Sequence, residues 1–326
     1  MKTGARAMKK WLGFALKAGI SLGILALIAV RTDLARIGTL LASVDGTTIA
    51  AVIALMMVQA LIGAYRWVLV MRRVEITMAF WAALQALYVS LFLNQCLPSY
   101  VGADVYRVYW LYRENHPLGS AVRGVVIDRV SAIIVLVLML GVSLPLLFVR
   151  LRAPAVQGGL AMVLLGGLAG TAVFFGGDLL PKRWQRSRLV GELAVLSATA
   201  RRVLLTGRTG AAVVCLAVLI HVITAVVMFN FARNLGLPLT PLDCLLFMPP
   251  IMLLAAVPIS ISGWGVREGV MVGALSMIGV GTEQALALSV LLGFTMLANG
   301  VIGVLPLILG GQRYWAGRMQ HLQPSE

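Results

Sequence analysis

Two arginines follow a proline at the same distance, each within a largely apolar stretch of the sequence. Arg107 lies nine residues after Pro98, and Arg267 lies nine residues after Pro258. Glycine and small polar residues fill much of both intervals. A guanidinium group is a planar donor that can bind a carboxylate or a phosphate through two parallel hydrogen bonds. The two arginines are therefore candidate ligands for an anionic group.

The glycines in these intervals indicate that a helix begins close to each arginine. We expect one helix to begin after Gly102 and the other near Gly265. The first N–H groups of a helix have no partner within it, and the helix dipole makes this end positive, which favours phosphate. Further contacts to a polar headgroup are expected from Asn94, Gln95, Ser99, Ser260, Ser262 and Gly263.

Acidic residues and further arginines lie close to both breaks. Asp104 precedes the first arginine by three residues, so the two share a helix face and can form an ion pair. Asp128 and Arg129 are neighbours that must point in different directions, and we expect separate partners for them. The same expectation applies to Arg267 and Glu268. The residues expected to orient the two arginines or to form gates are Asp104, Asp128, Arg129 and Glu268. The alternative is that these charges only hold the segments in place.

The elements that must position these residues are membrane-spanning helices. Hydrophobic residues make up 60% of the 326-residue chain, charged residues make up 12%, and the mean hydropathy is +0.95. Runs of about 20 apolar residues can cross a hydrocarbon core about 30 Å thick. We therefore predict an all-α polytopic membrane protein. A charge at membrane depth costs about 2.5–3.5 kcal/mol on insertion scales, so charged residues there normally face a cavity or a partner; Arg66 is a further such charge.

We predict about six spanning helices and two broken pairs of shorter helices. The spans are expected at residues 11–30, 47–70, 120–148, 157–177, 209–233 and 284–309. The broken pairs are expected at 76–97 with 103–115, and at 243–257 with 265–281. The chain is then a single integral membrane domain, 1–326, whose halves (about 1–177 and 209–326) are joined by a basic loop at 178–208.

Clusters of Lys and Arg orient these helices. The net charge of +15 is concentrated before the first span, in the loop at 178–208, and after the last span. The positive-inside rule places all three regions in the cytoplasm. The loop lies inside if the first broken pair enters from the cytoplasm and returns. The second pair starts and ends outside, as a re-entrant pair or as two crossings, and the re-entrant case corresponds to an inverted-topology repeat.

Aromatic residues are numerous near the breaks. Most of them are expected in the interfacial belts of the membrane: Tyr65, Trp67, Trp81, Tyr88, Tyr100, Tyr106, Tyr109 and Trp110. Tyr100, Tyr106 and Trp264 are the best candidates to line a cavity.

Signatures of common enzymes and of metal sites are absent from the sequence. It contains no GxxxxGK, GxGxxG, GxSxG or HExxH motif. Cys96, Cys215 and Cys244 have unrelated spacings, and His221, within a span, is expected to form a hydrogen bond in the bundle. Nucleic-acid binding is not expected, because the basic residues lie in short loops. We assign no catalytic residue, metal or cofactor.

Three motifs resemble those of the lysylphosphatidylglycerol synthase transmembrane-domain family. The residues from Asn94 to Arg107 resemble its N-x-x-x-P-x-x-x-G-x-D-x-x-R region, and Asp128-Arg129 resembles its DR helix start. The residues from Pro258 to Glu268 resemble its P-x-S-x-G-G-x-G-x-R-E segment. The likeness covers nearly the whole chain. It departs from the family pattern at Ala103, Ser262 and Trp264.

The resemblance implies a flippase-like membrane module. Bifunctional members carry a soluble aminoacyl-transferase domain after the membrane part, whereas this sequence ends at Glu326. We therefore expect a stand-alone lipid translocase of a bacterial inner membrane, with cytoplasmic termini and no lysyl-lipid synthesis. Its substrate would be a phospholipid or a polyprenyl-phosphate-type lipid, clamped by Arg107 and Arg267 on opposite sides. The alternative is a membrane-embedded enzyme that modifies a lipid or glycolipid, or an accessory subunit of a separate lipid synthase or glycosyltransferase.

Overall fold

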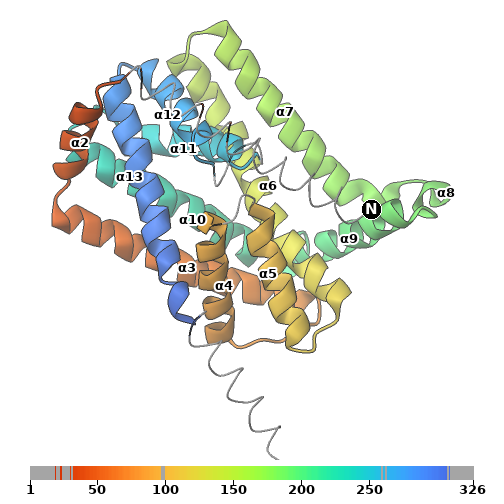
Figure 1. Cartoon of the computed structure of the whole chain (residues 1–326). Coiled ribbons are helices and arrows are strands. Elements are labelled where there is room, and N and C mark those ends of the chain that lie inside the picture. The colour runs from red at the N-terminus through yellow and green to blue at the C-terminus, as the bar shows by residue number, and fades with distance from the viewer. Residues whose placement is uncertain are drawn as a thin grey trace, which may run out of the picture.

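The computed structural model of the chain is a bundle of helices (Figure 1). It describes residues 19, 23, 30, 32–96, 100–257, 260, 263–306 and 308, and no strand occurs among them. The helices long and apolar enough to cross a membrane are α3 (Gly46–Arg73), α6 (Leu118–Arg150), α7 (Pro154–Gly176), α10 (Gly207–Asn234) and α13 (Thr282–Val301). They confirm five of the predicted spans and the all-α class. The remaining span, 11–30, lies almost entirely outside the described residues.

Two pairs of shorter helices occupy the positions of the predicted broken pairs. The first pair consists of α4 (Phe80–Cys96) and α5 (Tyr100–Arg113), and the second of α11 (Pro241–Ala255) and α12 (Val266–Ser276). The 11 residues of α12 extend only about 16 Å, too short to cross a bilayer core. Pro98 and Pro258 lie outside the described residues, and the helix before each of them ends at Cys96 or Ala255.

Helices α3 and α10, each of 28 residues, run antiparallel along one another (Figure 1). Near the start of α3, the Asp45 carboxylate accepts a hydrogen bond from the Asn234 amide at the end of α10. In the middle, Gln59 Nε2 lies 3.3 Å from Thr224 Oγ1. At the other end, Arg73 Nη2 lies 3.3 Å from the carbonyl oxygen of Thr206. The pair is thus joined along its whole length.

The long helix that follows each broken pair packs on the first helix of the other pair. Helix α6 contacts α11, and helix α13 contacts α4. The second contact is close, because a Cβ at Gly300 would lie 3.2 Å from the carbonyl oxygen of Leu91. When α3, α4, α5 and α6 are exchanged for α10, α11, α12 and α13, the principal packing contacts of one half correspond to those of the other.

The basic segment 178–208, predicted to be a loop, is largely helical. It contains the 3₁₀ turn η1 (Gly177–Leu179), α8 (Lys182–Gln185) and α9 (Arg188–Leu204). Buried residues of α9 recur at helical spacing, at Ala194, Ser197, Ala200, Val203 and Leu204, and α9 packs on α7 and α10. The sequence did not predict these helices within the segment, because the high charge obscured this apolar face. Figure 1 shows α8 and α9 at the far end of α7, away from α2.

The sequence also did not predict the short helix α2 (Leu34–Ala42). Asp33 caps it by accepting hydrogen bonds from the backbone N–H groups of Ala35 at 2.9 Å and Arg36 at 3.1 Å. Helix α2 packs against α13. A capping aspartate before a short apolar stretch was the available signal.

Candidate functional site

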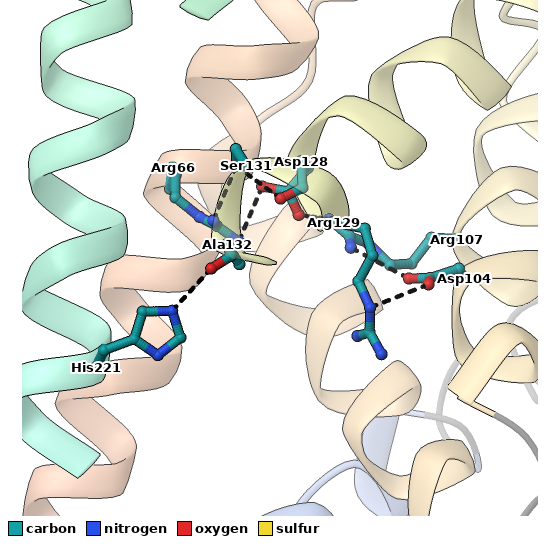
Figure 2. Close-up of polar contacts among 8 residues, drawn as sticks. All are labelled: Arg66, Asp104, Arg107, Asp128, Arg129, Ser131, Ala132 and His221. Atoms are coloured by element: carbon teal, nitrogen blue, oxygen red, sulfur yellow. Dashed lines mark hydrogen bonds and ion pairs between the residues drawn. The ribbon is translucent and has the colours of Figure 1, made fainter. Parts of the chain in front are cut away.

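Two arginines on different helices hold the carboxylate of Asp128 in α6 (Figure 2). Arg107 of α5 places Nη2 2.8 Å from Asp128 Oδ2, and Arg66 of α3 places Nη2 3.1 Å from Asp128 Oδ1. The exposed fractions of the three side chains are 6%, 9% and 4% for Arg107, Arg66 and Asp128. The first predicted clamp is therefore part of a buried ionic cluster that joins three helices.

Polar groups of α6 and α10 support this cluster. Arg66 Nη1 donates to Ser131 Oγ at 3.1 Å, and Ser131 Oγ donates to the carbonyl oxygen of Asp128 at 2.7 Å. His221 Nε2 lies 3.1 Å from the carbonyl oxygen of Ala132, one residue further along α6 (Figure 2). The expected hydrogen bond of His221 within the bundle is thus confirmed.

The outer edge of the cluster is formed by Asp104 and Arg129. Asp104 Oδ1 lies 3.6 Å from Arg107 Nη1, and Asp104 Oδ2 lies 3.8 Å from Arg129 Nε. The side chains of Asp104 and Arg129 are 22% and 38% exposed, far more than the inner members. The predicted Asp104–Arg107 pair is confirmed, and so are the separate partners of Asp128 and Arg129.

The Trp67 ring packs against the guanidinium group of Arg107. The Arg107 guanidinium carbon lies 4.0 Å from the centre of the Trp67 ring, a cation–π distance, and Trp110 lies next to Trp67 with 6.0 Å between ring centres. Trp67 is fully buried. The Trp67 side chain therefore packs against α5 inside the bundle and does not face lipid, which the sequence alone does not show.

The Arg107 cluster carries more positive than negative charge. Among the described residues, Arg66, Arg107 and Arg129 face two aspartates, a formal surplus of one positive charge. Buried donors are also in excess: Nε of Arg66, Nε of Arg107 and Nε1 of Trp67 have no acceptor within the described part of the chain. Surplus charge and unused donors in a buried place are properties of an anion-binding site.

The second predicted clamp has a different arrangement. Arg267 Nη2 lies 2.5 Å from Glu268 Oε1, and Ser289 of α13 bonds to both side chains, at 3.2 Å to Arg267 Nε and 3.1 Å to Glu268 Oε1. The separate partners expected for Arg267 and Glu268 were wrong. The flexible arginine stem folds back over its neighbour, and both residues are almost fully buried. This pair has no surplus charge of its own.

The start of α12 is closed by the protein's own carboxylate. Gly265 is the N-cap, as the sequence predicted, and its N–H donates to Glu268 Oε2 at 2.6 Å. Gly263 and Gly265 have φ angles of 76° and 86°, values that favour glycine over residues with a Cβ. The anion-favouring end of this helix is thus occupied by Glu268.

Trp264 and α13 enclose Arg267 from the remaining sides. The Arg267 guanidinium carbon lies 4.8 Å from the centre of the Trp264 ring, and that ring packs edge-on against Phe294 at 6.2 Å. A Cβ at Gly293 would lie 2.6 Å from the Trp264 ring. Glycine at this position is what allows α13 to pass so close to the pair.

The remaining predicted headgroup ligands are distributed over both broken pairs. Gly102 lies in the first turn of α5 and not before it, because this helix begins at Tyr100. Asn94 lies in the last turn of α4, and Ser260 is buried in the connection between α11 and α12. Ser99 and Ser262 lie outside the described residues. Arg66 and Trp67 are the functional candidates that the sequence did not assign to the site.

Comparison with known proteins adds one match. A family model described as the lysylphosphatidylglycerol synthase TM region matches residues 14–303. No curated protein and no solved structure matches the chain. In the described part of the chain, no three His, Cys, Asp or Glu side chains are grouped so that they could hold a metal ion.

Proposed function

Because the chain belongs to the family of lysylphosphatidylglycerol synthase transmembrane regions, we propose that it is a lipid translocase. It moves an anionic or phosphate-linked lipid between the leaflets of a bacterial inner membrane. The chain acts as a single membrane domain, with both termini in the cytoplasm. The lipid headgroup is bound by protein side chains, and its acyl or prenyl tail stays in the bilayer.

The observation that carries this proposal is the surplus positive charge of the Arg107 cluster. Ionised side chains at membrane depth are expensive, and those that are kept normally face a partner or a transported group. Arg66 and Arg107 are both buried and share the carboxylate of Asp128, so an anionic headgroup would supply further negative charge beside them. Guanidinium groups suit phosphate because they can donate two hydrogen bonds at once.

The two halves would work as an inverted repeat. Arg107 lies six residues before the end of α5, about 9 Å along its axis, and Arg267 lies nine residues before the end of α12, about 14 Å. With the orientation given by the basic residues, α5 ends at the cytoplasmic face and α12 at the opposite face. The correspondence of packing contacts between the halves supports this arrangement. A headgroup would then bind near Arg107 from the cytoplasmic side and near Arg267 from the opposite side.

The test is transbilayer movement in proteoliposomes. A fluorescent phosphatidylglycerol is incorporated, and the fraction accessible to an external quencher is followed over time. We expect the wild-type protein to accelerate movement, and Arg107→Ala and Arg267→Ala to abolish the acceleration. Arg123→Ala is the matched control, because Arg123 lies in α6 and bonds to Ser120 outside the cluster. Unchanged acceleration in both clamp variants would refute the roles of the two arginines, and a wild-type protein that does not accelerate movement would refute the translocase.

The same vesicles distinguish a translocase from an enzyme that modifies lipids. Mass spectrometry of the lipids after incubation should return the phosphatidylglycerol unaltered. A new lipid species that requires Arg107 would assign the cluster to lipid modification.

A further inference from the structure

The two aspartates of the Arg107 cluster are held very differently. The carboxylate of Asp128 makes contacts of 2.8 and 3.1 Å and is almost inaccessible. The carboxylate of Asp104 makes contacts of 3.6 and 3.8 Å, longer than a normal hydrogen bond, and its side chain is 22% exposed. Asp128 is therefore a fixed member of the cluster, whereas Asp104 is weakly bound at its accessible edge.

The way in which Asp104 bridges two arginines matches the shape of a phosphate group. One of its oxygens faces Arg107 and the other faces Arg129. A phosphodiester also presents two non-bridging oxygens from one atom, at a similar separation. Such a group could take both places of the carboxylate, and it would approach from the side where Arg129 is 38% exposed.

We propose that Asp104 is an internal counter-ion that an incoming oxyanion displaces from Arg107 and Arg129. The proposal rests on the proposed function, since it takes the oxyanion to be the phosphodiester of a lipid headgroup. In the empty protein, Asp104 lowers the cost of leaving two arginines next to each other. When the headgroup arrives, Arg107 keeps its short contact with Asp128 and exchanges Asp104 for the ligand.

The second cluster cannot bind an anion in this way. Its carboxylate, Glu268, is fully buried, lies 2.5 Å from Arg267, and also accepts the N–H of Gly265 at 2.6 Å. Displacing Glu268 would break all of these contacts at once and would leave a charge without a partner. In the conformation described, the exchangeable counter-ion therefore belongs to the Arg107 cluster.

The proposal predicts that removing the charge of Asp104 strengthens anion binding. Purified protein in detergent is titrated with dioctanoyl phosphatidylglycerol, and the apparent Kd is taken from the rise of the unfolding temperature with lipid concentration. We expect Asp104→Asn, which keeps the shape of the side chain, to bind this lipid about fivefold to tenfold more tightly than the wild type, because a competing charge is lost. Dioctanoylglycerol, which carries no phosphate, should bind both proteins equally.

Asp128→Asn is the matched control, because it makes the same chemical change in the same cluster. It should not tighten binding, since Asp128 positions Arg107. Inorganic phosphate at constant ionic strength separates the two sources of the anion. Competition that is stronger in Asp104→Asn supports displacement by a free anion, and strengthening confined to the lipid supports displacement by a headgroup.

Equal or weaker phosphatidylglycerol binding by folded Asp104→Asn protein would overturn the proposal. Folding is checked by size-exclusion chromatography and by the unfolding temperature without lipid. This failure is distinct from failure of the translocase. Tighter binding by Asp104→Asn without any transport by the wild type would refute the translocase but support the displacement of Asp104. Arg107-dependent transport with unaltered binding by Asp104→Asn would support the translocase but refute the displacement.

Discussion

Arg107 Nη2 lies 2.8 Å from Oδ2 of Asp128, and this buried ion pair joins the short helix α5 to the long helix α6. The two residues are 21 positions apart in the sequence. The 14 residues of α5 extend only about 21 Å, so this helix is too short to cross a bilayer core about 30 Å thick. The ion pair is thus a principal contact that fixes the position of α5 in the bundle.

Replacing Asp128 with Asn should destabilise the protein strongly. It leaves Arg66 and Arg107 buried next to each other without the carboxylate they share, and removing one partner of a buried ion pair costs about 3–5 kcal/mol. We expect a clearly lower unfolding temperature in detergent. Asp104→Asn, at the exposed edge of the cluster, should lower it much less, and equal losses would contradict the distinction between the two aspartates.

Gly293→Ala should disturb the second cluster specifically. The added Cβ would lie 2.6 Å from the Trp264 ring and would also collide with the Arg267 guanidinium, so the side chains must shift. Overpacking of this kind costs about 1–3 kcal/mol. Gly273→Ala on α12 is the control, because nothing lies within 4 Å of its Cβ position. Gly293→Ala should lower the thermal unfolding temperature more than Gly273→Ala. Equal unfolding temperatures would show that α13 can move away from Trp264 and Arg267.

The acid sensitivity of α3 should depend on Asp45. Hydrogen bonds from the Thr47 hydroxyl, the Thr48 backbone N–H and the Thr48 hydroxyl lower the pKa of Asp45 from 3.8 to about 2. Since the folded pKa is the lower one, Asp45 stabilises the fold above pH 3.8 and loses this contribution as the pH falls through about 2. The difference in unfolding temperature between wild type and Asp45→Asn should shrink over that interval. A difference independent of pH would contradict it.

The opposite entry of the two broken pairs can be tested by cysteine labelling. Glu114 follows the end of α5, and Ser276 ends α12; both are exposed. In a background without native cysteines, a membrane-impermeant maleimide should label Ser276→Cys in intact spheroplasts, and Glu114→Cys only after permeabilisation. Labelling of both from the same side would contradict the inverted arrangement.

The sequence predicted the helices and the charged positions better than the partners of those charges. Arg107, Asp128 and Arg66 stand out because each interrupts an apolar stretch. Which of them meet depends on the packing of α3 and α5 against α6, and no periodicity within one helix contains that information. Local spacing was sufficient for Asp104 and Arg107, which lie one turn apart on α5.

The spacing of Arg267 and Glu268 did not predict that these neighbours contact each other. Adjacent helical residues normally point about 100° apart. At the first turn of α12, however, Glu268 turns back to cap Gly265, and the long arginine side chain follows it. The equal distances from proline to arginine therefore suggested two equivalent sites, while the structure contains one open cluster and one closed pair.

The exchange of packing partners between the halves has a consequence for biosynthesis. Helix α4 is made early, but α13, on which it packs, is made nearly two hundred residues later. During translation α4 and α5 must stay in the membrane without that partner, with their charged residues held by α3 and α6 alone. The first half of the chain thus completes its assembly only after the ribosome has synthesised α13.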